Sequence, residues 1–381
     1  WGHAVSEDLI DWQEIEPAVV PEDEVGCWSG SVVVDDGTPV LFYTRPRSDE
    51  WGHGQVIRML GSADLMTWKR EPSTPLIDGP AHSDFFDFRD PHVRRDGESW
   101  KLTIGGGITD IGGAAFQYSS PDTINWSYDG VLAKGDKDSV TPLYTGTIWE
   151  CPQFIEVDDT WVMLISAMDR DGFAQVLYAI GDYDGKQFSP QHWGFFAHTS
   201  MMYATTTFRD KAGRPCAMSW LREKNNETPA GSAFAGAQGI AVVMEVVDQR
   251  LVLTPHPDLD AYLPERIDIS SPLTFDNVGA AWRIAVDLVA ESSFHMTVAG
   301  ESSWTMAVDR VHNHLVVTSD DETLLMMPLN AEPGVLDCIV DADILEVFWS
   351  AGEGSAAVRV PANQTATVTF MGSQFEGRLA R

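Results

Sequence analysis

A short polar motif that ends in tryptophan recurs along the sequence, and its spacing constrains the fold more than any other feature. The motif reads SEDLIDW at residues 6–12, SADLMTW at residues 62–68 and, more weakly, SPDTINW at residues 120–126. The three tryptophans are therefore 56 and 58 residues apart, and a degenerate fourth copy is expected to end at Trp193. Self-similarity at a fixed period of this kind is typical of propellers and other repeat architectures.

Between the copies lies a second repeated element, which reads as a strand, a polar turn and another strand. Its three cases span residues 32–44, 93–104 and 154–166, and Leu41, Leu102 and Met163 occupy matching places at steps of 61 residues. Asp-Gly and similar pairs between apolar runs indicate hairpins. Such a repeating unit predicts four-stranded propeller blades. Residues 1–258 hold enough of these units for four blades and part of a fifth.

The pattern changes after residues 256–270, which read as a linker or a short helix. Short alternating strands are expected beyond it, at residues 282–289, 294–298, 304–308, 314–318, 335–340, 344–349, 356–359 and 365–370. Even spacing with polar turns is typical of a β-sandwich. The chain is thus predicted to be all-β, with a five-bladed β-propeller at residues 1–258 followed by a C-terminal β-sandwich at residues 259–381.

The charge of the chain limits its partners. It has 57 acidic and 25 basic residues, which give a formal net charge of −32. Such a surface repels phosphate backbones and anionic membranes, so neither nucleic acid nor a membrane is an expected partner. A neutral small-molecule carbohydrate is not repelled. Fourteen tryptophans fit sugar binding, because the C–H faces of sugars stack on aromatic rings, although most single tryptophans are expected to lie in the core.

Cysteine, histidine and glycine patterns do not suggest a metal or a cofactor, and none is expected. Four scattered cysteines favour isolated buried thiols in a reducing compartment, and with the acidic composition they lean towards a cytoplasmic location. The run Gly105-Gly106-Gly107 has no Lys-Ser/Thr after it, so a tight turn is expected there and not a phosphate loop.

Two acidic residues stand out by their context. Asp90 lies in DFRDPH at residues 87–92, and Glu150 lies in IWECP at residues 148–152. Each is followed closely by proline, each is flanked by aromatic residues, and each precedes one of the repeated hairpins. Two carboxyl groups that converge on an aromatic pocket are the usual requirement for glycoside hydrolysis. The alternative is that both segments merely cap turns. The nearby Asp84 and Asp87 are expected to lie in a polar loop.

An ordered set of motifs resembles glycoside hydrolase family 32, the family of invertases, levanases and inulinases. The matching segments are WGHAVS at residues 1–6, WSGS at residues 28–31, FRDP at residues 88–91, WECP at residues 149–152, Tyr203-Ala204, Trp220, and Asp341 with LEVF at residues 345–348. Any one of them is weak, but they occur in the family's order from Trp1 to about residue 370.

The resemblance implies a role for each matching residue. Glu150 would be the general acid/base, Asp90 would stabilise the oxocarbenium-like transition state, and Arg89 would orient the carboxylates. The residues that would bind the substrate are Trp1, Trp28, Ser29, Arg89, Tyr203 and Trp220. The implied activity is that of a retaining β-fructofuranosidase, which releases fructose from sucrose or short β-fructans.

Two of the places where the sequence departs from the family pattern bear on its activity, and the first also implies that the first blade lacks its N-terminal strands. The family nucleophile is an aspartate in a Trp-Met-Asn-Asp-Pro-Asn-Gly-like motif upstream of the Trp-Gly-His motif, and this chain begins at the latter, so no nucleophile is assigned and the chain is expected to be inactive without that aspartate. Met201 stands where relatives carry a polar residue. Two alternatives therefore stay open, a fructosyltransferase of the same family and a carbohydrate-binding propeller that does not catalyse.

Overall fold

The protein is described by a computed structural model that covers residues 1–22, 24–47, 52–72, 74–223, 228, 235–263, 265–330, 332–351 and 354–381. The chain divides into two compact units, Trp1–Trp193 with Ala204–Thr206, and Gly194–Tyr203 with Thr207–Arg381. This division falls before the boundary at residue 258 that the sequence predicts, which stays a prediction. No helix in these ranges is long and apolar enough to cross a membrane.

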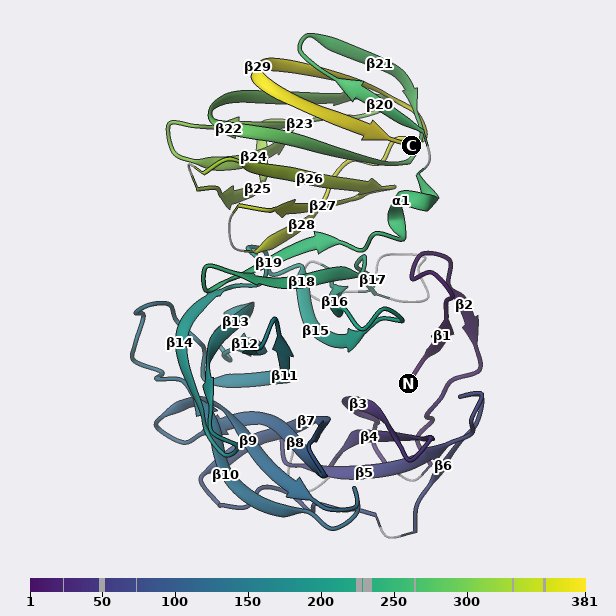
Figure 1. Cartoon of the computed structure of the whole chain (residues 1–381), viewed down its shortest axis with the longest axis vertical. Coiled ribbons are helices and arrows are strands. Elements are labelled where there is room, and N and C mark those ends of the chain that lie inside the picture. Colours follow the sequence, from purple (N-terminus) through teal and green to yellow (C-terminus); the bar gives the residue numbers. More distant parts are fainter. Residues whose placement is uncertain are drawn as a thin grey trace. The chain divides into compact units, whose positions relative to one another are not determined.

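The first unit is built from antiparallel sheets whose strands follow the chain order (Figure 1). One sheet has the four strands β3-β4-β5-β6, and β7–β10 and β11–β14 follow as two further sets of four strands, joined by the Trp149–Gly106 pairing of β11 with β8. The bounds are β3 Trp28–Asp35, β4 Thr38–Pro46, β5 Gly54–Gly61, β6 Trp68–Arg70, β7 Phe85–Asp96, β8 Ser99–Ile108, β9 Gly112–Ser120, β10 Ser127–Lys134, β11 Ile148–Val157, β12 Thr160–Met168, β13 Ala174–Tyr183 and β14 Phe188–Phe195.

The residues that recur at steps of 61 in the sequence occupy equivalent positions in the strand pairing of the inner hairpins. Leu41 pairs with Val32, Leu102 with Val93, and Met163 with Phe154, so each blade begins with the same hairpin. The three predicted hairpins are therefore confirmed.

The tryptophan-ending motif forms the turn between the two outer strands of each blade. In each copy the aspartate side chain, Asp8, Asp64 or Asp122, accepts a hydrogen bond from the backbone N–H two residues on. The residue after the aspartate is left-handed, with φ of 63–65° in all three copies. Aspartate favours such Asx turns because its short side chain bonds the backbone two residues ahead.

The same turn also identifies the outer strands of two further blades. In the first unit, β1 (His3–Val5) and β2 (Gln13–Ile15) flank the Asp8 turn and pair with each other, so they are the outer hairpin of a blade. The fourth copy lies between β13 and β14, where Asp184 Oδ1 accepts from the N–H groups of Lys186 and Gln187. The expectation that this copy ends at Trp193 is wrong, because Gly185 supplies the positive φ and the motif's leucine and tryptophan are not needed.

Buried polar atoms join the innermost strands of successive blades. The Ser31 hydroxyl on β3 donates to the carbonyl of Pro91 and accepts the N–H of Val93, both on β7 and both at 2.9 Å. One blade further, His92 Nδ1 accepts the N–H of Phe154 on β11 at 3.3 Å. Burial and the nearby Arg94 together lower the pKa of His92 to about 4, so the ring is neutral at pH 7 and can accept this bond. The inner strands are thus locked in register.

The three consecutive glycines lie inside strand β8, so the predicted tight turn is wrong. A Cβ added at Gly105 would lie 2.2 Å from the Trp149 carbonyl oxygen, and one added at Gly107 would lie 2.4 Å from the Phe86 ring. Glycine in a strand interior often marks such a close approach of a neighbouring strand. The glycines therefore allow β8 to pack closely against β7 and β11.

The second unit begins with a five-stranded sheet and continues into ten further strands. The first sheet has the order β15-β16-β18-β19, with β17 paired to β16. Its bounds are β15 Met202–Arg209, β16 Pro215–Leu221, β17 Ala237–Gln238, β18 Val242–Val247 and β19 Arg250–Pro255. The short helix α1 (Leu259–Tyr262) follows, where a linker or short helix is predicted.

The ten strands that follow form two layers that share β22 and β29. Residues 281–288 of β22 pair with β26, residues 295–299 pair with β23, and the register against β29 shifts between Leu288 and Ser293. A long strand with such an irregularity can pass from one layer to the other. The bounds are β20 Arg266–Ile269, β21 Leu273–Val278, β22 Ala281–Ala299, β23 Ser303–Asp309, β24 His314–Ser319, β25 Glu322–Pro328, β26 Gly334–Asp341, β27 Ile344–Trp349, β28 Ser355–Arg359 and β29 Ala366–Ala380.

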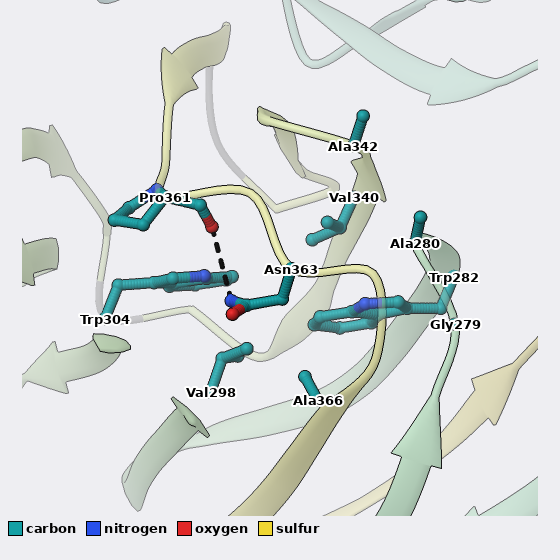
Figure 2. A pocket seen from close by; sticks show the side chains of 10 residues that line it. All are labelled: Gly279, Ala280, Trp282, Val298, Trp304, Val340, Ala342, Pro361, Asn363 and Ala366. Atoms are coloured by element: carbon teal, nitrogen blue, oxygen red, sulfur yellow. Dashed lines mark hydrogen bonds between the residues drawn. The ribbon is translucent and has the colours of Figure 1, made fainter. Parts of the chain in front are cut away.

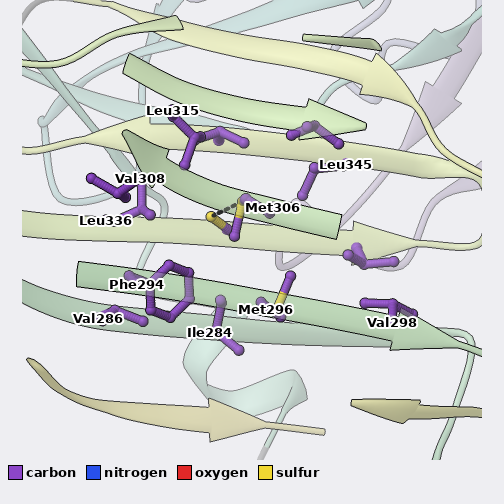
Figure 3. Close-up of a cluster of buried hydrophobic side chains, with 14 of the residues drawn as sticks. Ile284, Val286, Phe294, Met296, Val298, Met306, Val308, Leu315, Leu336 and Leu345 are labelled. Atoms are coloured by element: carbon purple, nitrogen blue, oxygen red, sulfur yellow. Dashed lines mark hydrogen bonds between the residues drawn. The ribbon is translucent and has the colours of Figure 1, made fainter. Parts of the chain in front are cut away.

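The core between these layers consists of the alternating apolar residues of the strands (Figure 3). Both halves of β22 contribute to it, Ile284 and Val286 from the first and Phe294 and Met296 from the second. Seven of the eight strands predicted from alternation lie within these elements, and the eighth overlaps β29 from Ala366 on, but the first two are one strand, β22. Strands β20, β21 and β25 were not predicted from the sequence.

Three tryptophans of this unit, Trp282, Trp304 and Trp349, are core residues. Trp282 and Trp304 stack with their rings 6.4 Å apart and 9° from parallel, and each is only 2% exposed. They border a hollow of about 10 Å³, beside which Asn363 donates a hydrogen bond to the Pro361 carbonyl (Figure 2). Such a volume holds about one water molecule, so no sugar fits there.

Candidate active site

The sequence-predicted site residues occupy one structural position in successive blades. Trp28-Ser29 on β3, Arg89-Asp90 on β7 and Glu150-Cys151 on β11 follow one another at steps of 61 residues. In each strand the register against the next strand shifts at this pair, which marks a β-bulge. Bulges turn side chains away from the regular alternation and are frequent next to active sites. The repeat therefore brings these residues together.

Two of the bulges place a residue other than glycine in the left-handed region. The φ of Asp90 is 64° and that of Cys151 is 46°, and each precedes a proline. This conformation is uncommon for residues other than glycine, asparagine and aspartate. Non-glycine residues that adopt it cluster at functional sites. In β15, Ala204 has a φ of 47° directly after Tyr203, so that strand carries a similar feature.

The Arg89 side chain connects the two candidate catalytic segments. Its Nε and Nη2 donate to Glu150 Oε1 at 3.1 and 2.8 Å. The Arg89 and Glu150 side chains are 11% and 22% exposed, so Glu150 is paired and still reachable from solvent. The carboxylates of Glu150, Asp90 and Asp87 raise the pKa of Arg89 against the opposing effect of burial. The guanidinium thus stays charged and fixes the orientation of Glu150.

Asp90 is the most buried carboxylate of the site, at 5% exposure. Its Oδ2 accepts the N–H of Cys151 at 2.9 Å, and its own N–H donates to the Thr44 hydroxyl at 2.8 Å. Burial raises the pKa of Asp90, Arg89 opposes this effect, and the charge of Glu150 adds to it, so that the resulting pKa is about 6. The carboxyl group is therefore mainly ionised at pH 7.

Cys151 is a structural neighbour of Asp90. Its thiol lies 3.5 Å from Asp90 Oδ2 and interacts with the Ser29 side chain. Burial, together with the charges of Asp90 and Glu150, raises the pKa of this thiol well above its usual value. Because the thiolate is the reactive form of cysteine, Cys151 is not an activated nucleophile. All four cysteines are free; Cys216 and Cys338 are buried as expected, whereas Cys27 and Cys151 remain partly accessible.

The predicted aromatic residues of the first unit lie beside this cluster. The Trp1 indole N–H donates to the Trp28 carbonyl at 3.0 Å, which ties the first residue to β3. The Arg89 guanidinium lies 6.0 Å from the centre of the Trp28 ring, at the limit of a cation–π contact. Trp28 is partly exposed and Ser29 is exposed, so both can contact a ligand.

Sequence reasoning missed two charged residues, Asp87 and Arg170. Asp87 is not in an exposed polar loop, because it lies within β7 and is 8% exposed. Its Oδ1 accepts from Arg89 Nη1 at 2.9 Å, and its Oδ2 pairs with Arg170 Nη2 at 3.1 Å. Asp87 has a φ of 52°, which no sequence pattern reveals. Arg170 lies between β12 and β13, a distance of 83 residues from Asp87 along the chain.

Tyr203 and Trp220 belong to the second unit. The Arg222 guanidinium lies 4.4 Å from the centre of the Tyr203 ring, and Tyr203 is 6% exposed. Trp220 pairs with Gln238 across β16 and β17. Their roles in binding substrate stay predictions.

Asp210, Cys216 and His256 gather in the described part of the second unit, with their potential ligand atoms within 4.8 Å of one another. Arg214 lies among them and donates to Asp210 Oδ2 at 2.6 Å, while its Nη2 is 3.3 Å from His256 Nε2. Arg214 lowers the pKa of Asp210, against the opposing effect of burial. The guanidinium thus supplies the positive charge of this cluster.

The arrangement in the first unit suits glycoside chemistry. A buried ionised carboxylate and a more exposed one flank a fixed guanidinium, and partly exposed indole and hydroxyl groups lie alongside. Two carboxyl groups with different surroundings can take different roles, one as acid/base and one as an electrostatic stabiliser.

Comparison with known proteins agrees with this geometry. Residues 1–255 match the family profile described as the glycosyl hydrolases family 32 N-terminal domain. The chain is similar to a sucrose-6-phosphate hydrolase of Bacillus subtilis, 24% identical over 98% of this chain and 83% of that protein. It is also similar to a fructan 1-exohydrolase of Aegilops tauschii, 35% identical over 41% of this chain and 26% of the relative.

A solved structure, the D63A mutant of a Bombyx mori GH32 β-fructofuranosidase in complex with sucrose, superposes with a TM-score of 0.83 at 22% identity, covering 100% of this chain and 84% of the other. This likeness concerns the fold, and it confirms the predicted five-bladed β-propeller followed by a β-sandwich. The family match extends over about two thirds of the sequence, and we conclude that the chain belongs to glycoside hydrolase family 32.

Proposed function

We propose that this protein is a retaining glycoside hydrolase that releases fructose from sucrose or short β-fructans. The observation that carries the proposal is the position of the Arg89 guanidinium, which donates hydrogen bonds to Glu150 and places a positive charge beside the buried Asp90. Family membership and relatives named as sucrose-6-phosphate and fructan hydrolases support the substrate class, a small-molecule carbohydrate.

Glu150 acts as the general acid/base in this proposal. Its carboxyl group donates a proton to the oxygen that leaves with the glucosyl group or the shortened fructan. It then takes a proton from the water that attacks the fructosyl intermediate. The 22% exposure of its side chain lets both substrate and water reach it, and Arg89 restricts its orientation. General acid–base catalysis contributes roughly 100- to 10,000-fold to a rate.

Asp90 stabilises the positive charge that develops on the fructosyl ring and accepts hydrogen bonds from its hydroxyl groups. Only the ionised form can accept through both oxygens, and its pKa of about 6 places that form at pH 7. The bulge at Asp90 and the N–H of Cys151 fix the direction of the carboxylate, so little reorganisation is needed during the reaction.

The remaining elements of the proposal rest on the family resemblance. Trp1, Trp28, Ser29, Tyr203 and Trp220 would line the sugar pocket, and residues 1–258 would form the catalytic propeller. The retaining mechanism also needs a nucleophilic carboxylate roughly 5 to 5.5 Å from the acid/base. No residue of this sequence is assigned that role, so the tests below use the natural full-length protein.

The test compares Glu150→Ala and Glu150→Gln with the matched control Glu156→Gln, an exposed position on the same strand. Fructose release from sucrose and inulin should fall by roughly 100-fold or more in both Glu150 variants and stay normal in the control. Added azide, which needs no general base, should restore turnover of Glu150→Ala on a substrate with a good leaving group and yield a fructosyl azide.

Other outcomes separate the alternatives. Products longer than the substrate, in place of free fructose, would assign the protein as a fructosyltransferase. Sugar binding without any turnover by the wild-type protein would assign it as a carbohydrate-binding propeller. Normal turnover in Glu150→Gln would remove Glu150 from the acid/base role.

A further inference from the structure

Four charged side chains of alternating sign form a continuous chain through the candidate active site. Arg170 Nη2 lies 3.1 Å from Asp87 Oδ2, Asp87 Oδ1 lies 2.9 Å from Arg89 Nη1, and Arg89 Nη2 lies 2.8 Å from Glu150 Oε1. The Arg170 side chain is 78% exposed, those of Asp87 and Arg89 are each 11% exposed, and that of Glu150 is 22% exposed. The chain therefore connects the solvent to the proposed acid/base.

We propose that Asp87, compensated from outside by Arg170, is a positioning residue that orients Arg89 and sets how readily Glu150 releases its proton. This inference rests on the proposed function. Asp87 and Arg170 touch neither of the two proposed reacting groups in the described contacts and act through Arg89.

The orientation of Arg89 depends on Asp87 because the guanidinium is planar and divided between two carboxylates. Nε and Nη2 point at Glu150, while Nη1 donates both to the carboxylate and to the backbone carbonyl of Asp87, at 2.9 and 3.1 Å. The fork of donors on arginine is rigid, so fixing one edge fixes the other. Without Asp87, the edge that faces Glu150 is free to rotate.

The backbone at Asp87 is held in an unfavourable conformation that produces this contact. Its φ is 52°, and the pairing of β7 with β8 shifts register between Phe86 and Arg89. Gly52 lies against it, since a Cβ there would come 2.9 Å from Asp87 Oδ1. Non-glycine residues in the left-handed region cost about 1 to 3 kcal/mol and persist where their surroundings fix them. The contact between Asp87 and Arg89 thus combines a strained backbone with a buried ion pair, which distinguishes it from a surface salt bridge.

The charges that face Glu150 from the surrounding elements can be named. Strand β7 contributes Asp87, Arg89 and Asp90, β11 contributes the neutral thiol of Cys151, and the segment between β12 and β13 contributes Arg170. Strands β3 and β8 contribute only uncharged groups at this level, the Trp28-Ser29 pair and the glycines of β8. These groups include two anions and two cations, and removing any one of them changes the electrostatic potential at Glu150.

Opposite effects therefore follow from the two outer residues. Neutralising Asp87 removes a negative charge, which favours loss of the proton from Glu150. Neutralising Arg170 leaves Asp87 uncompensated, which favours retention of that proton. A general acid must carry its proton, so the fall in kcat/KM at high pH should begin earlier in the first case and later in the second. A merely structural role would not produce opposite signs.

The test measures kcat/KM for sucrose against pH with the natural full-length protein and the variants Asp87→Asn and Arg170→Gln. We expect the high-pH limb to move down by about half a pH unit or more in Asp87→Asn and up by a smaller amount in Arg170→Gln. Because Arg170 is exposed, its effect should shrink as salt is added, and Arg170→Lys should restore the wild-type profile. The control Arg95→Gln, an exposed position on β7, should leave the profile unchanged.

Several results would overturn the inference and leave the proposed function intact. In an enzyme whose wild type releases fructose, these results are pH profiles of kcat/KM that do not move, pH shifts of the same sign in both variants, or a loss of kcat at every pH without a shift of the profile. If Asp87→Asn does not fold, Arg170→Gln decides alone, because its exposed side chain can be replaced without disturbing the core. A wild-type protein that hydrolyses neither sucrose nor inulin overturns the proposed function itself, and the inference with it.

Discussion

Replacing Asp90 by asparagine should abolish activity and at the same time stabilise the fold. Asp90 is buried, and its pKa is raised from 3.8 to about 6 because the ionised form is desolvated. A difference of this size corresponds to about 3 kcal/mol of destabilisation by the ionised carboxylate, since each pKa unit corresponds to about 1.36 kcal/mol. Asparagine keeps an oxygen that can accept the N–H of Cys151 but carries no charge, so it removes this cost.

The pH dependence of the stabilisation follows from the direction of the pKa shift. Between about pH 4 and pH 6 the native state binds more protons at Asp90 than the unfolded state, so the wild-type protein loses stability as the pH rises. Asp90→Asn does not titrate. The difference in unfolding free energy between variant and wild type should therefore be near zero below pH 4, grow through pH 6, and level off at up to about 3 kcal/mol above it.

Urea denaturation followed by tryptophan fluorescence at pH 4, 5, 6 and 7.5 measures this difference, with Asp110→Asn as the matched control. Asp110 is exposed, also has a positive φ, and lies in the turn between β8 and β9. The control should not change stability. An Asp90→Asn protein that is less stable than wild type at pH 7.5, or equally stable at every pH, would refute the reasoning that burial destabilises the ionised carboxylate.

Three further outcomes are expected from the structure. Glu346→Gln should raise the unfolding free energy relative to wild type, by an amount that grows from about pH 4.5 to pH 8. Burial raises the pKa of Glu346 to about 8, and its Oε2 has no hydrogen-bond partner, so the ionised side chain destabilises the fold. A difference between variant and wild type that is the same at every pH would contradict this. Gly30→Ala should lower the unfolding free energy by about 1 to 3 kcal/mol or more, because its Cβ would lie 1.9 Å from the Phe42 carbonyl oxygen; an unchanged denaturation midpoint would show that β3 can move. Arg89→Lys should reduce kcat for sucrose at least tenfold without unfolding the protein, because lysine cannot hold two carboxylates with a rigid fork, and normal kcat would remove Arg89 from the proposed role.

The repeat made much of the propeller predictable. The aspartate of each turn and the 61-residue step between hairpins are local signals, and the structure uses them in the turns and in the register. The fourth turn was misplaced because Gly185 adopts the required positive φ by itself, so the turn does not show the side-chain pattern of the other copies. The continuity of β22 was missed because the polar run Glu291-Ser292-Ser293 looks like a turn, whereas the strand changes layers there.

The candidate site was predictable only as far as its motifs reached. Arg89, Asp90 and Glu150 stand in recognisable segments, and the bulges bring them together. Asp87 looked like a loop residue, because neither its left-handed backbone nor its pairing with Arg170 leaves a trace in the sequence. Contacts between residues 83 positions apart depend on the register of the blades, which the sequence pattern does not specify side chain by side chain.

The central claim is a retaining fructosyl transfer to water that is assisted by Glu150. Its most direct test is to let the natural full-length protein act on sucrose in the presence of methanol and to determine the anomeric configuration of the methyl fructofuranoside by NMR. The account predicts the β-anomer, formed together with free fructose and lost in Glu150→Gln. An α-anomer, or the absence of both products, would contradict it.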